Sequence, residues 1–542
     1  MTDCGYGAAR AEHRAQPTDG DLRVGRHREL LVGVDRDLLV GRHAMAQLLR
    51  RLSGRGPSAA FHHMAQPSDI PDALPGYQLV HATVYFRHGS RAPVHSELPG
   101  AQDVAWEDCC QEKRARLLAD TTLLDLGGGP ASPSVVDQRQ QSVKMRGGCC
   151  SGELTLTGAQ QGVRLGKSLQ ERYGALLGSD GADRLTVRST NVARCVMTAR
   201  AVLFGLLGDA AASGPVPIAT APSNVEDLTP NAKRCARLAE LWDEARRDWS
   251  QSAANAHPLH SPTLAALRRL MPASDLSAYG VEHGRWVPLK DILTASAALP
   301  SAPPLQWGVD LDLLASIDEL AAAQVGHLMG HGRDAEFQQA VVRVGVGAAL
   351  GRLASSLKAA AAAAAASAPA ATSLKAAAAS APPATSATAA SPAADVQAAP
   401  PAALSLFSGH DTTVLPLLTA LGLWDRAWPP FCAALSFELW MPKTEEEGGA
   451  GAGAAPLVRV LFRTAPFAAP HGGGSLPPRR AAERAAAAPD GSEDFEWREM
   501  ARYSLPQFAA LVEPLVPVDL DAECLPRHSA VQTRRLQEGS QF

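Results

Sequence analysis

Short apolar runs alternate with amphipathic stretches along the chain, which predicts strands separated by helices. Buried strands are expected where brief runs are rich in aliphatic, β-branched and aromatic side chains, at Leu79–Phe86, Leu185–Arg188 and Leu404–Phe407. A hairpin is expected from the alternating segments Leu435–Trp440 and Leu457–Arg463. Apolar residues recur with helical spacing in Val192–Leu207, Leu264–Met271, Leu311–Val325, Phe337–Leu357 and Thr412–Leu423. One more helix is expected to begin with Thr157 as its N-cap, with Gln160 completing a capping box, and to stop at Gly174.

This order of elements favours an α/β fold, in which a mostly parallel sheet is flanked by helices and carries an inserted helical cap domain. The pattern places the α/β core at residues 76–215 and 402–525 and the helical cap at 216–357. Three segments lack this pattern of strands and helices: a leader at 1–71, an Ala/Ser/Pro low-complexity linker at 358–401, and an insert at 468–491. We expect these segments to be disordered, the linker being at most partly helical.

Composition narrows the classes of function. Lys and Arg number 51 against 55 Asp and Glu, a net charge of −4, so nucleic-acid binding is not expected. No run of about 18 large apolar residues occurs, so no transmembrane helix is predicted. The nine cysteines include no CxxC pair, and the chain lacks an N-x-S/T acceptor and a signal-peptide pattern. Neither a metal site nor a stable disulfide framework is therefore expected.

Charged and imidazole side chains follow the three buried strands. The first strand leads into Arg87, His88 and Arg91, the second ends in Arg188, and the third leads into His410 and Asp411. Sites in α/β sheets lie outside the carboxyl ends of the strands, so these groups are expected to meet. Guanidinium forks match a phosphate dianion, an imidazole can attack phosphorus, and a carboxylic acid can protonate the leaving alkoxide. A bound dianion would also oppose ionisation of the carboxyl group and keep it available as an acid.

The motifs stand in a fixed order: Arg87-His88-Gly89-Ser90-Arg91-Ala92-Pro93, then Arg188-Ser189-Thr190-Asn191, then His410-Asp411-Thr412-Thr413. In this order the chain resembles the histidine acid phosphatases, and within them the lysophosphatidic acid phosphatase (acid phosphatase type 6) branch. Further marks of that branch are Asn191 after the Arg-Ser-Thr triplet and the segment Trp428-Pro429-Pro430-Phe431.

The resemblance implies a phosphoglycerate-mutase-like fold and a role for each matching residue. His88 is the implied nucleophile and Asp411 the implied proton donor, while Arg87, Arg91, Arg188 and His410 make up the implied phosphate-binding set. No metal or other cofactor is implied. The implied substrate is a phosphate monoester, above all lysophosphatidic acid, which would give monoacylglycerol and phosphate.

The resemblance also favours a mitochondrial or other organellar location. The leader stretch Met45–Ser68 contains three arginines and no acidic residue, which suits a transit segment. A leader without function explains this composition equally well.

Several residues have competing interpretations. Arg188 can instead pair with a carboxylate, and Asp411 can serve as a helix N-cap. Arg194 is interpreted as structural or as a rim charge. Gly166-Lys167-Ser168 imitates the end of a phosphate-binding loop but lies inside an expected helix, and His331 is expected in a surface turn.

Two rival functions stay open at this stage. A broad-specificity or inositol-phosphate phosphatase is favoured by a basic cap, which has six candidate arginines: Arg234, Arg237, Arg246, Arg247, Arg268 and Arg269. A non-catalytic pseudoenzyme would bind phosphate or lipid and could lack the nucleophile or the acid, but both His88 and Asp411 are present.

Overall fold

The computed structural model describes residues 73–208, 214–301, 303–367, 402–443, 454–464 and 495–527, all of which belong to the unit Ala65–Phe542. The leader predicted at 1–71, most of the linker predicted at 358–401 and the insert predicted at 468–491 lie outside the described residues.

The described strands form one sheet whose larger part is parallel. They are β1 (Tyr77–Arg87), β2 (Thr121–Asp125), β3 (Leu185–Thr190), β4 (Val216–Ala221), β5 (Leu404–Gly409), β6 (Ala434–Pro442), β7 (Leu457–Thr464) and β8 (Glu496–Ser504). Their order is β2-β4-β3-β5-β1-β6-β7-β8, parallel from β2 to β1 and antiparallel from β1 onward to β8. The predicted mostly parallel α/β sheet is confirmed. Because β5 lies between β1 and β3, the carboxyl ends of these three strands share one edge.

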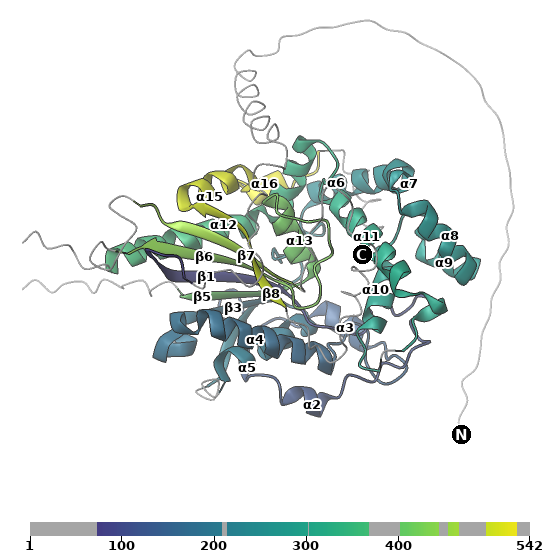
Figure 1. Cartoon of the computed structure of the whole chain (residues 1–542), viewed down its shortest axis with the longest axis horizontal. Helices are drawn as coiled ribbons and strands as arrows, with labels where there is room; N and C mark the ends of the chain where they lie inside the picture. Colours follow the sequence, from purple (N-terminus) through teal and green to yellow (C-terminus); the bar gives the residue numbers. More distant parts are fainter. Residues whose placement is uncertain are drawn as a thin grey trace, which may run out of the picture. The chain divides into compact units, whose positions relative to one another are not determined.

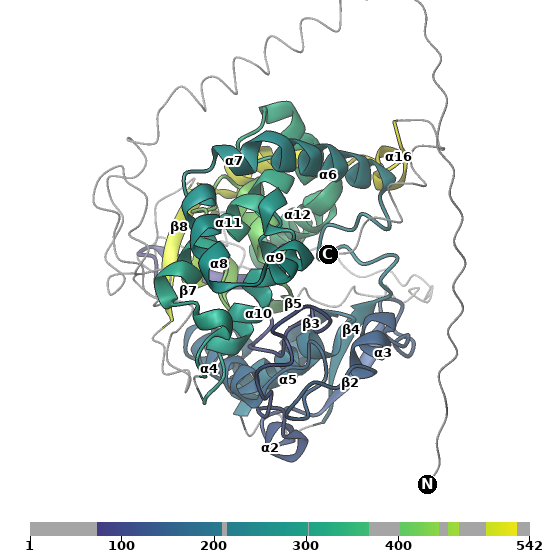
Figure 2. The same cartoon turned by 90° about the vertical axis from the view of Figure 1, so that its right-hand side faces the viewer.

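Helices cover both faces of the sheet and one of its ends. They are α2 (Gln111–Ala115), α3 (Val135–Gln141), α4 (Leu156–Leu177), α5 (Ala193–Leu207), α6 (Ala236–Asp248), α7 (Ala254–Ala256), α8 (His260–Leu270), α9 (Ala273–Tyr279), α10 (Val287–Ala297), α11 (Leu311–Leu328), α12 (Ala335–Ser367), α13 (Asp411–Ala420), α15 (Leu505–Val512) and α16 (Leu520–Glu523). Helices α4 and α5 pack on one face, and α12, α13 and α15 pack on the other (Figure 1). The cap helices α6–α11 gather beyond one end of the sheet (Figure 2).

The side chains of β1 alternate between the two faces of the sheet and contribute to a separate apolar core on each face. Val84 and Phe86 are buried with Leu165 of α4, whereas Tyr85 is buried on the opposite face in the cluster that includes Leu350 of α12. Successive side chains of a strand point to opposite faces, so one run of apolar residues serves both layers. This explains why the strand appears in the sequence as a continuous apolar stretch.

Glycines let α4 and α5 approach each other closely. A Cβ atom on Gly166 would lie 2.1 Å from the carbonyl oxygen of Val202, and one on Gly205 would lie 2.1 Å from that of Val163. Gly166 therefore serves helix packing inside α4, in agreement with the rejection of a phosphate-binding loop there.

The predicted ends of this helix are wrong. Its N-cap is Thr155, whose side chain accepts a hydrogen bond from the backbone of Gly158, and it continues past Gly174 to Leu177. Leu176 and Leu177, beyond the predicted stop, are buried apolar residues, and their packing outweighs the preference of glycine for a helix end.

The predicted domain boundaries also need correction. Residues 216–221, assigned to the cap, form strand β4 of the core sheet, pairing with β2 and β3. β2 was not predicted at all, because its five residues are mostly partly exposed at the sheet edge and show little apolar pattern. Helix α12 continues to Ser367, ten residues into the predicted linker, because a run of alanines favours the helical state.

Helix α12 is long and apolar enough to span a bilayer by length and composition, and 56% of its most apolar window is buried inside the protein. It packs against β1, β6 and α13, as the core helix of a globular domain does.

Two disulfides correct the expectation that no such framework exists. Cys109 bonds to Cys149, and Cys235 at the start of α6 bonds to Cys524 at the end of α16. The partners lie 40 and 289 residues apart in the chain, so only the fold brings them together. The first disulfide uses one cysteine of each vicinal pair, which leaves Cys110 and Cys150 free.

Candidate active site

The three motifs meet at the shared edge of β1, β3 and β5. Arg87 is the last residue of β1 and pairs in register with Gly409 of β5. The backbone N–H of His88 then donates to the carbonyl oxygen of Gly409 at 3.0 Å. The imidazole rings of His88 and His410 lie 5.5 Å apart, edge to face. The predicted meeting of the first and third motifs is therefore observed.

The loop after β1 is fixed by the start of α4. A Cβ atom on Gly89 would lie 2.2 Å from the carbonyl oxygen of Gly158, and one on Gly158 would lie 2.1 Å from that of Ser90. Thr198 accepts a hydrogen bond from the Gly89 backbone, and Gln161 accepts one from that of Ser90. Only glycine allows this approach, so the glycine after His88 is a geometric requirement of the site.

His88 has the protonation state of a nucleophile. Its Nδ1 lies 2.8 Å from the carbonyl oxygen of Gly89, which can only accept, so Nδ1 carries the proton and Nε2 keeps its lone pair. Burial, followed by the positive charges of Arg194, Arg91 and Arg87, holds the pKa of His88 well below its usual range. Both effects favour the neutral imidazole over its protonated form.

Arg87 and Arg91 are buried beside His88, each with a carboxylate partner. Arg87 pairs with Asp411 at 2.9 Å, and Arg91 pairs with Asp291 of the cap helix α10 at 2.7 Å. The second oxygen of Asp291 accepts the backbone N–H of Val94 at 2.9 Å. This carboxylate thus links the cap to the loop that carries His88.

The segment Trp428–Phe431 completes the surroundings of Arg87 and Asp411. The carbonyl oxygen of Pro429 accepts a hydrogen bond from Arg87 at 2.7 Å, and the guanidinium lies 4.2 Å from the ring centre of Phe431. Trp428 donates from its indole nitrogen to Asp411 at 3.2 Å. The sequence marked this segment as a family feature without assigning it a contact.

Arg188 pairs with carboxylates, which the sequence left open as the alternative to phosphate binding. One guanidinium nitrogen lies 3.0 Å from Glu226 and 2.5 Å from Asp227. Its Nε, like those of Arg87, Arg91 and Arg194, is buried and has no hydrogen-bond partner among the described residues. Buried donors are normally satisfied, so these four Nε groups are available to a bound anion.

His410 and Asp411 stand at the start of α13. His410, not Asp411, is the N-cap, and its backbone N–H donates to the side chain of Thr413 at 3.0 Å. Burial and the charge of Arg194 lower the pKa of His410 to about 3. Burial opposes ionisation of Asp411, but Arg87 and Lys290 outweigh it and lower the pKa of this carboxyl to about 2. In the protein alone Asp411 is therefore ionised in mild acid.

Two buried cations of the site were not assigned to it from the sequence, since Arg194 was interpreted as structural or as a rim charge and Lys290 was not singled out. Arg194, on the first turn of α5, exerts the largest coulombic effect on both His88 and His410, and burial lowers its own pKa to about 10. Its position six residues after Arg188, at the start of the next helix, was the only available signal. Lys290 of α10 had none, because its approach to Asp411 depends on how the cap meets the sheet.

Lys290 is a buried cation next to the acid. Its Nζ lies 3.5 Å from Asp318 and 3.9 Å from the ring centre of Trp428, the residue that donates to Asp411. Burial lowers the pKa of Lys290 to about 8, so it is charged in acid and at neutral pH.

His331 lies in a turn between α11 and α12 and packs against Trp424, as the sequence suggested for this histidine.

A neutral imidazole with a free Nε2, set among arginines and beside a carboxyl group, is suited to phosphoryl transfer from a monoester. The fold and this site are those of a phosphatase.

The comparisons with known proteins agree. Residues 78–279 match the model of the histidine phosphatase superfamily (branch 2). The lysophosphatidic acid phosphatase type 6 of Homo sapiens is 29% identical over 374 residues, which cover 67% of this chain and 74% of that protein. Human testicular acid phosphatase is 26% identical over 377 residues, which cover 68% of this chain and 69% of that protein. A phytase of Hafnia alvei, solved with myo-inositol hexakis sulphate, shares the fold with a TM-score of 0.51 and 17% identity, over 84% of this chain and all of that one. The chain thus matches the histidine phosphatase superfamily (branch 2) over residues 78–279, resembles acid phosphatases over most of its length, and is a phosphoric monoester hydrolase.

Proposed function

We propose that this enzyme hydrolyses lysophosphatidic acid or a similar lipid monoester through a phosphohistidine on His88. The observation that carries the proposal is the hydrogen bond from Nδ1 of His88 to Gly89, which leaves Nε2 as the nucleophile. The neutral state of the buried imidazole supports attack on phosphorus in acid.

In the first step, Nε2 of His88 forms a bond to phosphorus while the bond from phosphorus to the ester oxygen breaks. Arg87, Arg91, Arg188 and His410 bind the phosphoryl oxygens, and Arg194 adds positive charge. Asp411 gives its proton to the departing alkoxide. In the second step, the oxygen of a water molecule forms a bond to phosphorus while the bond from phosphorus to Nε2 of His88 breaks and returns its electron pair to the imidazole. The ionised Asp411 takes a proton from that water, and inorganic phosphate leaves.

Binding of the substrate must change the charge balance around Asp411. The carboxylate pairs with Arg87 in the protein alone. A phosphate dianion that binds Arg87 competes for this pair and repels the carboxylate, so both effects raise the pKa of Asp411. The proton donor thus forms when the substrate is bound.

The arginines of the cap support a lipid monoester over an inositol polyphosphate. Four of the six candidates are paired with carboxylates: Arg234 with Asp521, Arg237 with Glu240, Arg246 with Asp243 and Arg268 with Glu282. A polyphosphate needs several cations that are free to bind it, and paired cations offer less. The aromatic rings of Phe431 and Trp428 beside Arg87 and Asp411 add apolar surface next to the reacting groups.

The test is an assay of the purified protein at acid and neutral pH without added metal, on lysophosphatidic acid, inositol hexakisphosphate and an aryl phosphate. We expect turnover that prefers the lipid and is lost in His88→Ala, while the matched control His331→Ala keeps it. Turnover that depends on His88 but favours inositol hexakisphosphate would make the enzyme an inositol-phosphate phosphatase. Full activity of His88→Ala would refute the nucleophile.

We further propose an organelle that permits disulfides as the location of this enzyme. Two disulfides support this, because reducing compartments keep thiols free. A fluorescent fusion of the whole chain, compared with one that lacks residues 1–71, tests whether the leader directs it there; identical distributions in the cytosol would contradict the proposal.

A further inference from the structure

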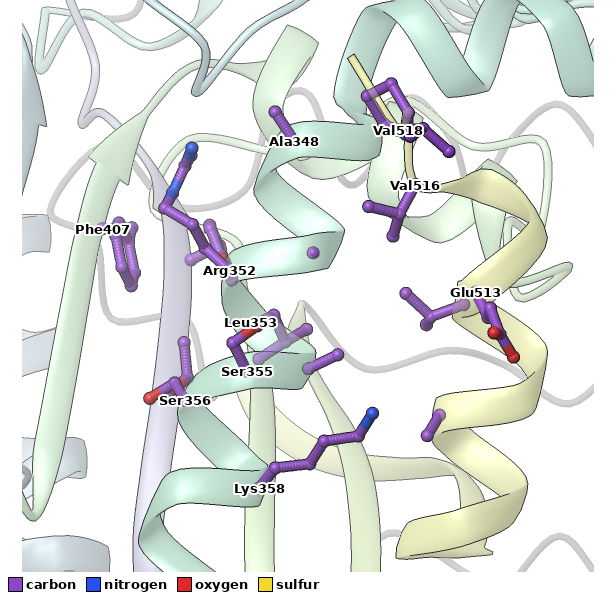
Figure 3. A pocket seen from close by; sticks show the side chains of 17 residues that line it. Ala348, Arg352, Leu353, Ser355, Ser356, Lys358, Phe407, Glu513, Val516 and Val518 are labelled. Carbon is purple, nitrogen blue, oxygen red and sulfur yellow. The ribbon is translucent and has the colours of Figure 1, made fainter. Parts of the chain in front are cut away.

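A cavity lies on the face of the sheet opposite to α4 and α5, between α12 and the segment that follows α15. Its volume is about 870 Å³, and its walls include Tyr85, Phe407, Arg352, Lys358, Val512 and Val516 (Figure 3). We call it the α12 cavity. None of its lining residues belongs to the proposed catalytic set.

A second hollow extends the α12 cavity along α15. It has a volume of about 460 Å³, shares Lys358, Ala509 and Glu513 with the α12 cavity, and reaches Leu505 and Pro506 at the start of α15. Small-molecule sites have volumes of about 300–1,000 Å³. The two hollows together therefore offer an elongated space.

The walls of the α12 cavity are largely apolar. Leu353, Val512 and Val516 line it together with the rings of Tyr85 and Phe407, which stack at 4.6 Å. Apolar walls of this kind favour a hydrocarbon chain, because its transfer from water is favourable.

Two cations stand in these walls, the partly buried Arg352 and the exposed Lys358. Arg352 donates from one terminal nitrogen to Asp227, but its Nε and its other terminal nitrogen are buried and have no partner in the described chain. Lys358 reaches into the space between α12 and α15, and it forms no ion pair with any described residue (Figure 3). Glu513 is the single acidic residue of the lining. The unused donors favour a negatively charged group.

We infer that the α12 cavity binds a single-chain anionic amphiphile, with its chain along the apolar walls and its carboxylate or phosphate at the buried donors of Arg352, while Lys358, on another side of α12, adds positive charge to the cavity (Figure 3). A fatty acid and a lysophospholipid share this chemistry. The site is distinct from the one that holds His88, so its occupation does not require hydrolysis.

The cavity is connected to the candidate active site through one carboxylate. Asp227 accepts hydrogen bonds from Arg352 and, at 2.5 Å, from Arg188. An anion on Arg352 competes with Asp227 for that guanidinium, so Asp227 interacts more strongly with Arg188. Occupation of the cavity should then raise the KM of the phosphatase reaction. This coupling rests on the proposed role of Arg188 in binding phosphate, whereas the binding itself does not.

The test is calorimetric titration of the full chain, below the micelle concentration of each probe and with saturating inorganic phosphate to occupy the catalytic site. The probes are decanoate, dodecanoate, dodecyl phosphate and dodecyltrimethylammonium. We expect both anions to bind, and the affinity to rise about fourfold for each added methylene. We expect Ala509→Trp, which fills both hollows, to abolish binding and Lys358→Glu to weaken it roughly tenfold. Lys167→Glu, which changes an exposed lysine of α4 on the other face, is the matched control and should bind normally.

Tighter binding of dodecanoate would identify a fatty acid as the ligand, and tighter binding of dodecyl phosphate a lysophospholipid; either supports the site. Equal binding of dodecyltrimethylammonium, or full binding by Lys358→Glu, would overturn it, as would no binding by the unchanged protein. Lys358→Glu keeps the test valid if Ala509→Trp does not fold. A chain that binds dodecanoate but does not hydrolyse lysophosphatidic acid would refute the proposed substrate and leave this inference standing.

Discussion

Replacement of Asp411 by asparagine distinguishes two possible roles of Asp411, donating a proton and only positioning Arg87. Asparagine has nearly the same shape and keeps an oxygen that can accept hydrogen bonds from Arg87 and Trp428, as Asp411 does now. It cannot deliver a proton to an alkoxide. The rate of Asp411→Asn should therefore decrease more for a leaving group that needs protonation than for one that does not.

The magnitude follows from the charges around the carboxyl group. With the pKa of Asp411 at about 2, roughly one molecule in a thousand carries the proton at pH 5, a cost of about 4 kcal/mol. General acid catalysis is worth roughly 10²- to 10⁴-fold, or about 3–5 kcal/mol, so the cost in the protein alone would cancel most of it. The acid can act only if bound phosphate raises this pKa. We therefore expect Asp411→Asn to lose roughly 10²- to 10⁴-fold on an alkyl phosphate. On 4-nitrophenyl phosphate, whose leaving group is far more acidic, we expect the loss to stay below about tenfold.

The assay is the single-turnover release of the alcohol or phenol at pH 5, which isolates formation of the phosphohistidine. Asp310→Asn is the matched control, because Asp310 is an exposed N-cap of α11 and asparagine keeps its hydrogen bond to Leu313. Equal losses on the two substrates would refute the reasoning and make Asp411 a positioning residue.

Three further changes test the surroundings of the site and the fold. Lys290→Met removes a cation that lowers the pKa of Asp411, so the alkaline limb of the plot of kcat against pH should move to higher pH. The control Lys290→Arg keeps the charge and should leave the limb in place. An unmoved limb in both variants would contradict the effect of Lys290 on Asp411. His410 has a pKa of about 3 in the folded protein against 6.5 in the unfolded chain, so stability is full above pH 6.5 and decreases on acidification. The free energy of unfolding, measured with urea, should decrease between pH 7 and pH 5 by about 2 kcal/mol less in His410→Gln than in the unchanged protein. Equal decreases in the two proteins would be inconsistent with a neutral buried ring. Cys235→Ser removes the disulfide between α6 and α16 and should cost about 2–4 kcal/mol of unfolding free energy, whereas Cys110→Ser, at a free cysteine, should cost little in the same experiment.

Part of the candidate site was predictable because its residues directly follow strands. Arg87 and His88 end the first buried strand, and His410 and Asp411 follow the third. Parallel neighbours bring such strand ends together, so local pattern and a general rule of α/β sheets were sufficient. Arg188 was placed correctly at the end of its strand, but its pairing with carboxylates was only one of two interpretations.

Residues that reach the site from other elements left no local signal. Lys290 and Asp291 lie on a cap helix about 200 residues after the His88 loop, and the sequence around them shows only helical spacing. Strand β2 was missed because its side chains are mostly partly exposed, and strand β4 was assigned to the cap. The disulfide between Cys235 and Cys524 joins positions 289 residues apart, which no spacing rule connects.

The class of fold and the candidate motif residues follow from the sequence, because periodicity and motif order are properties of the chain alone. The charge states of these residues depend on the tertiary structure. Burial and the charges of Arg194, Arg91 and Arg87 hold the pKa of His88 well below its usual range, and Asp411 is ionised because Arg87 and Lys290 outweigh its burial. A pKa depends on distances and desolvation, and these exist only after distant segments have packed together.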